Sequence, residues 1–151
     1  MEPINLYMAK HQVKLKARLV LIQEGEILLL KQTKPNGGNY TLPGGTIEQE
    51  EFAREALIRE SREEVGIQLQ KEDLHLAFVA HKRTGKKHRI VFYFQTNIYA
   101  GRPKSREHDK FSKFIWADLQ RLPDKVTPTV RKVIKRLRAG KQYTELAMGE
   151  D

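Results

Sequence analysis

The sequence predicts an α+β fold in which a mixed β-sheet is sandwiched between α-helices. Two observations support this class: segments with the short apolar or alternating patterns of strands outnumber the helical segments, and the two helical patterns stand far apart in the chain. The 151 residues suffice for one domain with a sizeable core. Because no linker divides the chain, we expect a single domain over residues 1–151, with its core at about 12–140 and peripheral ends.

The N-terminal third is expected to begin with a β-hairpin. Residues 13–22 alternate apolar and basic side chains before an apolar finish, and residues 27–30 form a second apolar run. Glu24 and Gly25 between them indicate a turn, so the two segments are expected to pair as a hairpin. A short extended piece follows at 40–42 and is stopped by a Pro-Gly-Gly run.

The middle of the chain predicts a helix and a second hairpin. Residues 48–65 form the first helical pattern, and Gly66 suits the position after its last turn. Two apolar segments, 74–81 and 88–95, flank a turn and predict the hairpin. Three phenylalanines of this hairpin are expected in the core, namely Phe78, Phe92 and Phe94.

The C-terminal third predicts a polar loop, a strand and a helix. Residues 101–110 are expected to form the loop and 114–116 the short strand. Residues 128–139 are expected to form the last helix, with Thr127 as its N-cap and one apolar stripe at helical spacing. The basic face of this helix follows from amphipathicity alone.

The composition excludes several classes of protein. The chain has no cysteine, so it lacks disulfides, thiolate metal sites and thiol nucleophiles. Its longest apolar runs are five residues, whereas a membrane span needs about 20. The apolar segment of a secretory signal is not visible at the N-terminus. We therefore expect a cytoplasmic protein without a membrane partner.

Charge is distributed unevenly in this basic chain, which has 28 Lys and Arg against 19 Asp and Glu and a net charge of +9. Seven glutamates fall within residues 48–64, whereas residues 74–106 hold eight Lys or Arg and no acid. Basic surfaces attract polyanions such as nucleotides and RNA. A group of carboxylates beside them would repel phosphate unless a divalent cation stood between. The alternative is that the charge serves solubility alone.

The helix expected at 48–65 gathers three carboxylates on one face. At about 100° per residue, Glu60, Glu63 and Glu64 lie within one sector together with two alanines. Like charges this close repel, and a hard divalent cation with oxygen ligands, with magnesium as the expected ion, would stabilise them. The alternative is an ordinary solvated helix face.

The loop before this helix carries a second signal, the glycine pair Gly44 and Gly45. Glycines there allow the backbone to approach a ligand closely, and the N-terminus of a following helix offers free N–H groups to phosphate. An ordinary Pro-Gly turn is the alternative.

Together these residues resemble a family signature. Seven residues match the Nudix box at its fixed spacing within 45–67, namely Gly45, Glu51, Arg59, Glu60, Glu63, Glu64 and Gly66. Two departures are Ser61, where the box usually has a bulky aliphatic side chain, and Tyr40, where the family more often has Trp. The first hairpin, the segment around Trp116 and the closing helix are similar to the layout of small Nudix hydrolases, so the resemblance covers nearly the whole chain.

The resemblance implies an enzyme that cleaves a nucleoside diphosphate linked to another moiety, by water attack on phosphorus with bound Mg²⁺ or Mn²⁺. By similarity, Glu60 and Glu64 are direct metal ligands, and the Gly44 carbonyl completes the metal shell. Glu63 is a further ligand or the base that acts on the water. Arg59 holds one of the box glutamates in place through a charge-assisted bond.

A catalytic carboxylate outside the box is also expected. Glu107 is the first acid after the acid-free stretch and lies in a loop shortly before the strand at 114–116. Similar Nudix enzymes carry, in a loop at this place, a carboxylate that binds metal or takes the proton from water, and loops held by a rigid sheet commonly bear such groups. Asp109 is the rival, and a solvated acid without a role is the alternative.

The expected substrate is a nucleoside triphosphate, canonical or of the 8-oxo-dGTP type. ADP-ribose or a nucleotide sugar is less favoured, because the short chain lacks the N-terminal extension that ADP-ribose hydrolases commonly use to dimerise. The net charge keeps an RNA 5′ end open as a substrate. A Nudix module that binds nucleotide or RNA without turnover is the alternative outside enzymes, and the three box glutamates argue against it. Monomer and homodimer both stay open.

Polar residues of the second hairpin and the loop after it carry weaker signals. His81, His88 and His108 are expected to be solvated, because no metal-ligand spacing links them. Five cations surround the hairpin tip, namely Lys82, Arg83, Lys86, Lys87 and Arg89. A solvated tip is the default, although a nucleotide or an RNA 5′ end could use it.

Overall fold

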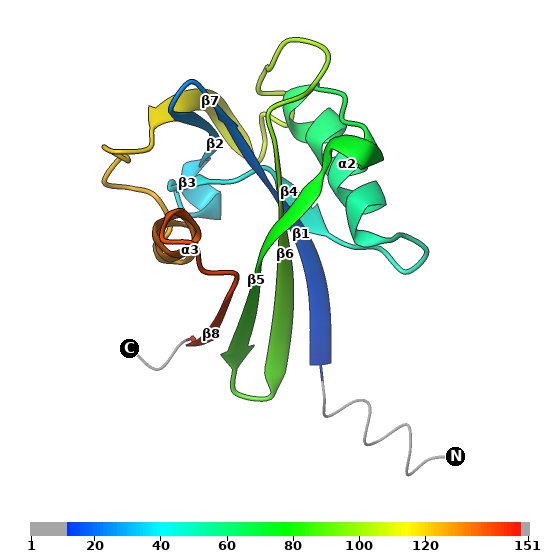
Figure 1. Ribbon diagram of the computed structural model, residues 1–151, viewed down its shortest axis with the longest axis vertical. Helices are drawn as coiled ribbons and strands as arrows, with labels where there is room; N and C mark the ends of the chain where they lie inside the picture. The colour runs from blue at the N-terminus through cyan, green and yellow to red at the C-terminus, as the bar shows by residue number, and fades with distance from the viewer. Residues whose placement is uncertain (1–11, 149–151) are drawn as a thin grey trace.

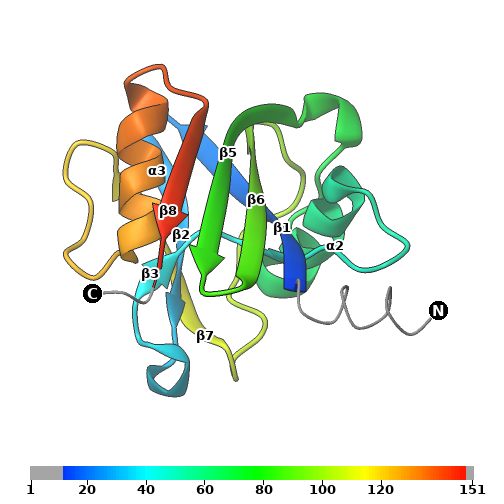
Figure 2. The same cartoon turned by 90° about the horizontal axis from the view of Figure 1, so that it is seen from below.

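The computed structural model describes residues 12–148 and arranges them in three layers (Figure 1). Helix α2 (Ala53–Val65) covers one face of a mixed β-sheet, and helix α3 (Pro128–Arg138) covers the other (Figures 1 and 2). This arrangement confirms the predicted α+β class with a sheet between helices. Within the described range, none of the helices has the length and apolar character that a membrane crossing requires.

Strand β1 (Gln12–Gln23) organises the sheet. It runs parallel to β6 (Lys87–Thr96) along most of its length and antiparallel to the short β4 (Gly44–Thr46). At its C-terminal end the chain turns at Gly25, whose φ is +79°, into β2 (Glu26–Gln32). Tight hairpin turns need such a positive φ, which glycine adopts without strain. The first predicted hairpin is therefore confirmed.

The remaining strands complete the order β3-β2-β1-β6-β5-β8, with β7 paired to β2 and β4 to β1. They are β3 (Tyr40–Thr41), β5 (His75–Thr84), β7 (Phe111–Asp118) and β8 (Tyr143–Ala147). Two 3₁₀ helices, η1 (Lys34–Asn36) and η2 (Lys71–Asp73), lie in connections. The second hairpin and the strand predicted at 114–116 are confirmed, and both are longer than predicted. The sequence pattern does not predict β4 and β8.

Alternation along the strands divides the core into two layers. In β1, Leu19 packs in the α2 layer and its neighbour Val20 in the α3 layer, because successive side chains of a strand point to opposite faces. Phe94 is buried in the α2 layer and Phe78 in the α3 layer, as predicted. Phe92 is only partly buried at the edge of the α2 layer.

Helix α3 begins where the sequence predicts. Thr127 is its N-cap, and the Thr127 hydroxyl oxygen accepts a hydrogen bond from the Val130 N–H at 3.4 Å. The apolar stripe is buried against the sheet, and its members are Val130, Val133 and Ile134. Amphipathic patterning therefore suffices to place this helix.

Helix α2 begins at Ala53, five residues later than the predicted start at 48. The preceding residues form a turn in which the Glu51 N–H donates to the Glu48 carbonyl, and the Glu51 carboxylate accepts from the Glu48 N–H, both at 3.0 Å. Arg59 binds the same carboxylate. This contact between residues eight apart competes with helix formation, and a helical pattern alone does not predict it. Gly66, with φ of +71°, ends the helix as predicted.

Candidate active site

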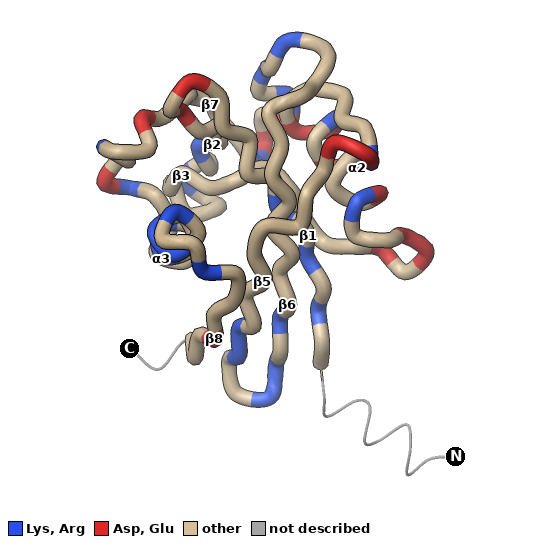
Figure 3. Tube along the Cα trace, in the orientation of Figure 1, with Lys and Arg blue, Asp and Glu red and all other residues tan. Residues whose placement is uncertain are grey.

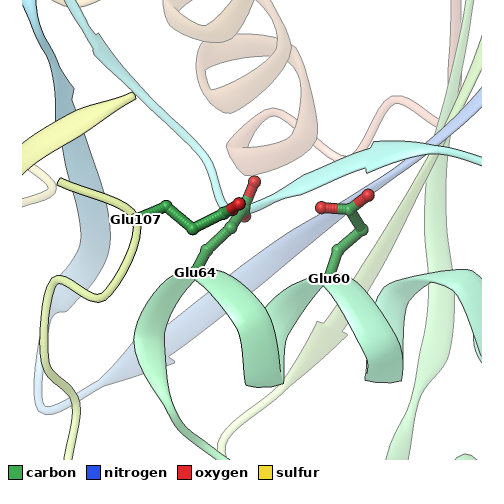
Figure 4. Close-up of side chains that lie close together, drawn as sticks. All are labelled: Glu60, Glu64 and Glu107. Carbon is green, nitrogen blue, oxygen red and sulfur yellow. The ribbon is translucent and has the colours of Figure 1, made fainter. Parts of the chain in front are cut away.

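Three carboxylates from two parts of the chain meet beside β4. Glu60 and Glu64 lie one turn apart on α2, and Glu107 reaches the same place from the loop before β7 (Figure 4). One oxygen from each side chain lies within 4.8 Å of the others. We refer to Glu60, Glu64 and Glu107 as the carboxylate cluster. Their like charges repel, so the cluster is electrostatically incomplete by itself.

Glu64 is the most buried member of the cluster, with 3% of its surface exposed. Its Oε1 accepts a hydrogen bond from the Gly44 N–H at 2.8 Å. The pKa of Glu64 is raised to about 8, first by burial and then by the nearby Glu60 and Glu107 carboxylates. The Gly44 N–H and the Arg18 guanidinium oppose it. A cation beside Glu64 would therefore favour its ionised form.

Glu107 is held over the end of α2 by its loop. The Arg106 N–H donates to the Glu64 carbonyl at 3.0 Å, which satisfies one of the carbonyls that a helix end leaves free. Oε1 of Glu107 is buried and has no hydrogen-bond partner among residues 12–148, while Oε2 lies 3.5 Å from the Lys110 ammonium. A buried acceptor without a partner is costly. Oε1 is therefore suited to a ligand from outside the chain.

Arg59 links the carboxylate cluster to Glu51 through hydrogen bonds of its guanidinium. Its Nε and Nη2 donate to the two oxygens of Glu51 at 2.7 and 3.0 Å, a bidentate contact that fixes the guanidinium plane. This hydrogen bonding lowers the pKa of Glu51. The remaining nitrogen, Nη1, donates to Glu60 Oε1 at 3.0 Å and to Glu63 Oε2 at 3.4 Å. Arg59 therefore orients Glu60 while Glu51 holds Arg59.

Gly44 and Gly45 belong to strand β4, and each lies so close to a neighbouring residue that a side chain would not fit. Gly44 has φ of +137°, and a Cβ there would lie 2.1 Å from the Ala17 carbonyl oxygen. A Cβ on Gly45 would lie 2.6 Å from the carboxylate carbon of Glu60. The glycines therefore allow β4 to lie close to β1 and to Glu60, and an ordinary Pro-Gly turn does not describe them. The helix expected to follow these glycines from residue 48 starts only at Ala53, so its N-terminus lies farther along the chain from them than predicted.

Arg18 joins the site, and sequence reasoning missed it. Its Nη1 donates to the Leu42 carbonyl at 3.1 Å and to the Gly44 carbonyl at 3.2 Å. Gly44 therefore contacts Arg18 through its carbonyl and Glu64 through its N–H. In the sequence, Arg18 is one of several basic residues that alternate along the first strand. Nothing in that pattern distinguishes it, because its contacts depend on the pairing of β1 with β4.

Two other sequence candidates lie outside the carboxylate cluster. The Glu63 side chain is 48% exposed, and within the described residues its polar contact is with Arg59 at 3.4 Å. The helical wheel placed Glu63 beside Glu60 and Glu64, but the structure groups those two with Glu107 instead. Asp109 is exposed, and its backbone carbonyl, not its carboxylate, accepts hydrogen bonds from nearby side chains.

Two histidines differ from the expectation of solvated side chains. His81 Nε2 and His88 Nδ1 lie 2.9 Å apart across the β5–β6 hairpin, and both residues are half-buried. His108 is exposed, as expected. Ser61, which departs from the box pattern, is fully buried, and its hydroxyl has no partner among residues 12–148. That environment is the apolar one in which the box usually places an aliphatic side chain.

The donor set of the cluster suits a hard divalent cation. All three side chains offer oxygen atoms, which Mg²⁺ and Ca²⁺ prefer, and no sulfur or imidazole nitrogen belongs to the group. The unpartnered Oε1 of Glu107 and the buried carboxylate of Glu64 are both stabilised by added positive charge. The residues present therefore fit a divalent cation.

Comparison with known proteins agrees with this chemistry. The NUDIX domain profile matches residues 13–137. The ADP-ribose pyrophosphatase of Methanocaldococcus jannaschii is 31% identical over 117 residues, which are 77% of this chain and 68% of that protein. The uncharacterized Nudix hydrolase YvcI of Bacillus subtilis is 33% identical over 110 residues, or 69% of this chain and 67% of its own.

A solved structure supports the same assignment. The MutT NUDIX hydrolase from Burkholderia pseudomallei superposes with a TM-score of 0.75 and 26% identity, covering 83% of this chain and 98% of that one. The family match spans most of the chain and includes every element that builds the carboxylate cluster. The chain therefore belongs to the Nudix hydrolase family and is an enzyme of the pyrophosphohydrolase class.

Proposed function

We propose that this enzyme uses a bound divalent cation, Mg²⁺ in the first instance, to hydrolyse a pyrophosphate bond of a nucleoside triphosphate, canonical or of the 8-oxo-dGTP type. One observation carries the proposal: Glu60, Glu64 and the unpartnered Glu107 converge within 4.8 Å beside the Gly44 backbone. Three carboxylates without a cation would repel a phosphate chain. With a divalent cation bound, the site would attract the phosphate chain of the substrate.

The roles of the residues follow from their placement. Glu60, Glu64 and the Gly44 carbonyl would hold the cation, with Glu63 at the exposed rim as a further ligand. The cation, when bound, neutralises charge that develops on the phosphate oxygens. Arg59 is a positioning residue, because its guanidinium contacts Glu60 and Glu63 and would act through them.

Glu107 is assigned as the base that takes the proton from the attacking water. Its buried Oε1 has no competing donor within the described chain, so it is free to accept a hydrogen bond from water. The hydrogen bond from the Arg106 N–H to the Glu64 carbonyl holds the backbone next to Glu107 beside the end of α2. Glu63 is the alternative base, and its greater exposure disfavours it, since a solvated carboxylate is held less firmly.

Two other substrates have specific support. The relative from Methanocaldococcus jannaschii carries the name ADP-ribose pyrophosphatase, which makes ADP-ribose the second candidate. A triphosphorylated RNA 5′ end is the third, because the chain has a net charge of +9. The first candidate rests on the fold shared with MutT proteins, such as the one from Burkholderia pseudomallei.

The test is a substrate panel with Mg²⁺, comparing wild type with Glu64→Gln. Nucleoside triphosphates, 8-oxo-dGTP, ADP-ribose and triphosphorylated RNA are each resolved into products by chromatography. Release of nucleoside monophosphate and pyrophosphate from a triphosphate supports the proposal. Faster release of AMP and ribose phosphate from ADP-ribose would replace it with the second candidate. Incorporation of ¹⁸O from labelled water shows which phosphorus is attacked. No Glu64-dependent turnover of any substrate would overturn the function.

A further inference from the structure

Lysines and arginines lie next to one another on β1, β5 and β6, on the face of the sheet that also packs against α3. Lys14, Lys16 and Arg18 alternate along β1 and so share one face of the sheet, the face on which Val20 packs against the α3 layer. Lys14 pairs with Arg89 of β6, and Arg89 pairs with Lys82 of β5, so these three side chains lie side by side. We call these five residues the cationic strip, namely Lys14, Lys16, Arg18, Lys82 and Arg89. Figure 3 shows lysines and arginines gathered at this end of β1, β5 and β6.

Among residues 12–148, the cationic strip has no acidic partner. The ion pairs found within residues 12–148 all involve Arg59 or Lys110, and the strip residues take part in none of them. Cations placed directly opposite one another in a sheet destabilise it. Four of the five are nevertheless half-buried rather than extended into solvent. Half-buried cations without an acidic partner among residues 12–148 suit an anion from outside the chain.

The electrostatics of Lys16 reflect this crowding. The pKa of Lys16 is lowered to about 8, first by burial and then by the charges of the other four strip residues. The pKa of Lys82 is lowered by the same causes, burial first and then Arg89 and Arg18. A bound polyanion would reverse both effects, because it brings the opposite charge to the whole strip.

The strip begins at the active site. Arg18 lies at one end, where its guanidinium contacts the Gly44 carbonyl beside the carboxylate cluster. From Arg18 to Lys14 the strand runs four residues, or about 13 Å at the usual rise. At the far end, a cavity of about 470 Å³ is lined in part by Lys14, Lys82 and Arg89. The cationic surface is therefore longer than a single phosphate group requires.

We propose that the cationic strip binds phosphate groups of the substrate that lie beyond the pyrophosphate bond being cleaved, so that the preferred substrate is a nucleotide with an extended polyphosphate chain. This inference rests on the proposed function and deepens it. It favours nucleoside tetraphosphates and dinucleoside polyphosphates, which share this chemistry, over ADP-ribose, whose only phosphates are the two joined by the bond that is cleaved.

The surroundings of the strip favour a polyphosphate chain over single-stranded RNA. Proteins that bind single strands stack bases on exposed aromatic side chains. Among residues 12–148, Tyr93 and Phe78 follow Arg18 in register across β6 and β5, and both are buried in the core. Tyr40 packs in the same layer but lies on β3, two strands away from β1. Val91 and Ala80, which stand beside Lys16 in register, are buried and apolar. Within residues 12–148, the strip therefore offers charge without an adjacent exposed aromatic ring.

The first experiment measures binding without catalysis. Inorganic tripolyphosphate is titrated into the protein by calorimetry in metal-free buffer. The variant Lys16→Gln/Lys82→Gln/Arg89→Gln should bind about tenfold or more weakly than wild type, since each lost contact is a hydrogen bond to a charged group. The matched control, Lys71→Gln/Lys132→Gln/Lys135→Gln, removes the same charge from exposed positions of η2 and α3 and should stay within about twofold. Equal losses in the two variants would overturn the proposal.

The second experiment measures specificity. The strip variant should lower kcat/KM for a nucleoside tetraphosphate about tenfold or more and leave that for ADP-ribose within about twofold. Uniform loss on both substrates, or loss only on triphosphorylated RNA, would overturn the inference and, in the second case, point to RNA. If wild type turned over no nucleotide yet bound tripolyphosphate through the strip, the proposed function would fail while the anion site stood. Should the triple variant not fold, Lys82→Gln alone is tested by the same two criteria, with Lys132→Gln as its control.

Discussion

The carboxylate cluster and the cationic strip are both groups of like charge, yet the chain holds them differently. The carboxylates are braced: Gly44 holds Glu64, Arg59 holds Glu60, and Lys110 stands beside Glu107. In the strip, Arg18 alone is fixed by side-chain hydrogen bonds to the backbone, while Lys16 and Lys82 show no such bonds within residues 12–148. Bracing suits an ion that needs fixed geometry, whereas long unbraced lysines suit a flexible anion.

The same comparison has an energetic side. Each group is destabilising until a ligand of the opposite charge binds, and each ligand then favours the binding of the other. A cation bound at the carboxylate cluster would attract a phosphate chain, and a phosphate chain bound at the cationic strip would bring oxygen atoms toward the cation. The two regions meet at Gly44, which contacts Glu64 on one side and Arg18 on the other. Variants on either side should therefore separate catalysis from binding.

The largest expected effect is on the braced side. Glu64→Gln should lower kcat by about 10³ or more, because it would remove the buried carboxylate proposed to bind the cation while keeping the shape of the side chain. The decrease should be smaller for the exposed rim residue in Glu63→Gln. Steady-state kinetics with Mg²⁺ measures both, and circular dichroism confirms that each variant is folded. Glu50→Gln, which removes an exposed carboxylate from the turn before α2, is the control. A Glu64→Gln variant with more than about a tenth of wild-type kcat would contradict the assignment.

The second effect concerns the loop carboxylate. Glu107→Gln should lower kcat by about 10²–10⁴ and change the acidic limb of the pH profile, because the proposed base would be lost. Asp109→Asn removes a charge two residues away, outside the cluster, and should leave both unchanged. The measurement is kcat across the pH range for the two variants. Equal activity in both variants and wild type would return the base to Glu63.

The sequence predicts the parts of this site that depend on local periodicity. The helical repeat places Glu60 and Glu64 on one face, and the acid-free stretch draws attention to Glu107. Arg18 is not predictable in this way, since its contacts require β4 to pair with β1. Glu63 shows the limit of a helical wheel, which gives direction along one helix but not what the neighbouring loop brings.

The fold is predictable to a similar extent. The patterns of α3 and the two hairpins are strong because each element buries a regular apolar stripe. The strand Tyr143–Ala147 lacks such a pattern and is defined by its pairing with the edge of β5. The late start of α2 depends on Arg59, which binds Glu51 and keeps it in a turn. Elements set by contacts between distant residues escape local reasoning.

A third prediction uses stability to distinguish the two regions. The pKa of Glu64 rises from 4.5 to about 8 on folding. The native state of the metal-free protein therefore holds a proton that the unfolded state releases, and stability should fall as pH rises between these values. Mg²⁺ replaces the proton, so it should raise the melting temperature more above this range than within it. Calorimetry with and without Mg²⁺ measures this, and Glu64→Gln should abolish the dependence. An equal rise in melting temperature with Mg²⁺ within and above this pH range would count against a cation site at Glu64.

The smallest expected effect concerns Lys16 of the cationic strip, which should make stability rise with pH, whereas Glu64 should make it fall. The pKa of Lys16 falls from 10.5 to about 8 on folding, so charged Lys16 destabilises the native state fully below pH 8. Between about 8 and 10.5 the native state binds fewer protons than the unfolded state, and wild-type stability should rise with pH. Lys16→Gln removes the repulsion and should raise the melting temperature at neutral pH by about 2 °C. The gain should shrink toward pH 10.5 and should be absent in Lys71→Gln, since Lys71 lies in η2, away from the strip. A lower melting temperature for Lys16→Gln at neutral pH would show that Lys16 stabilises the fold, and the strip could no longer be described as a group of unbalanced charges.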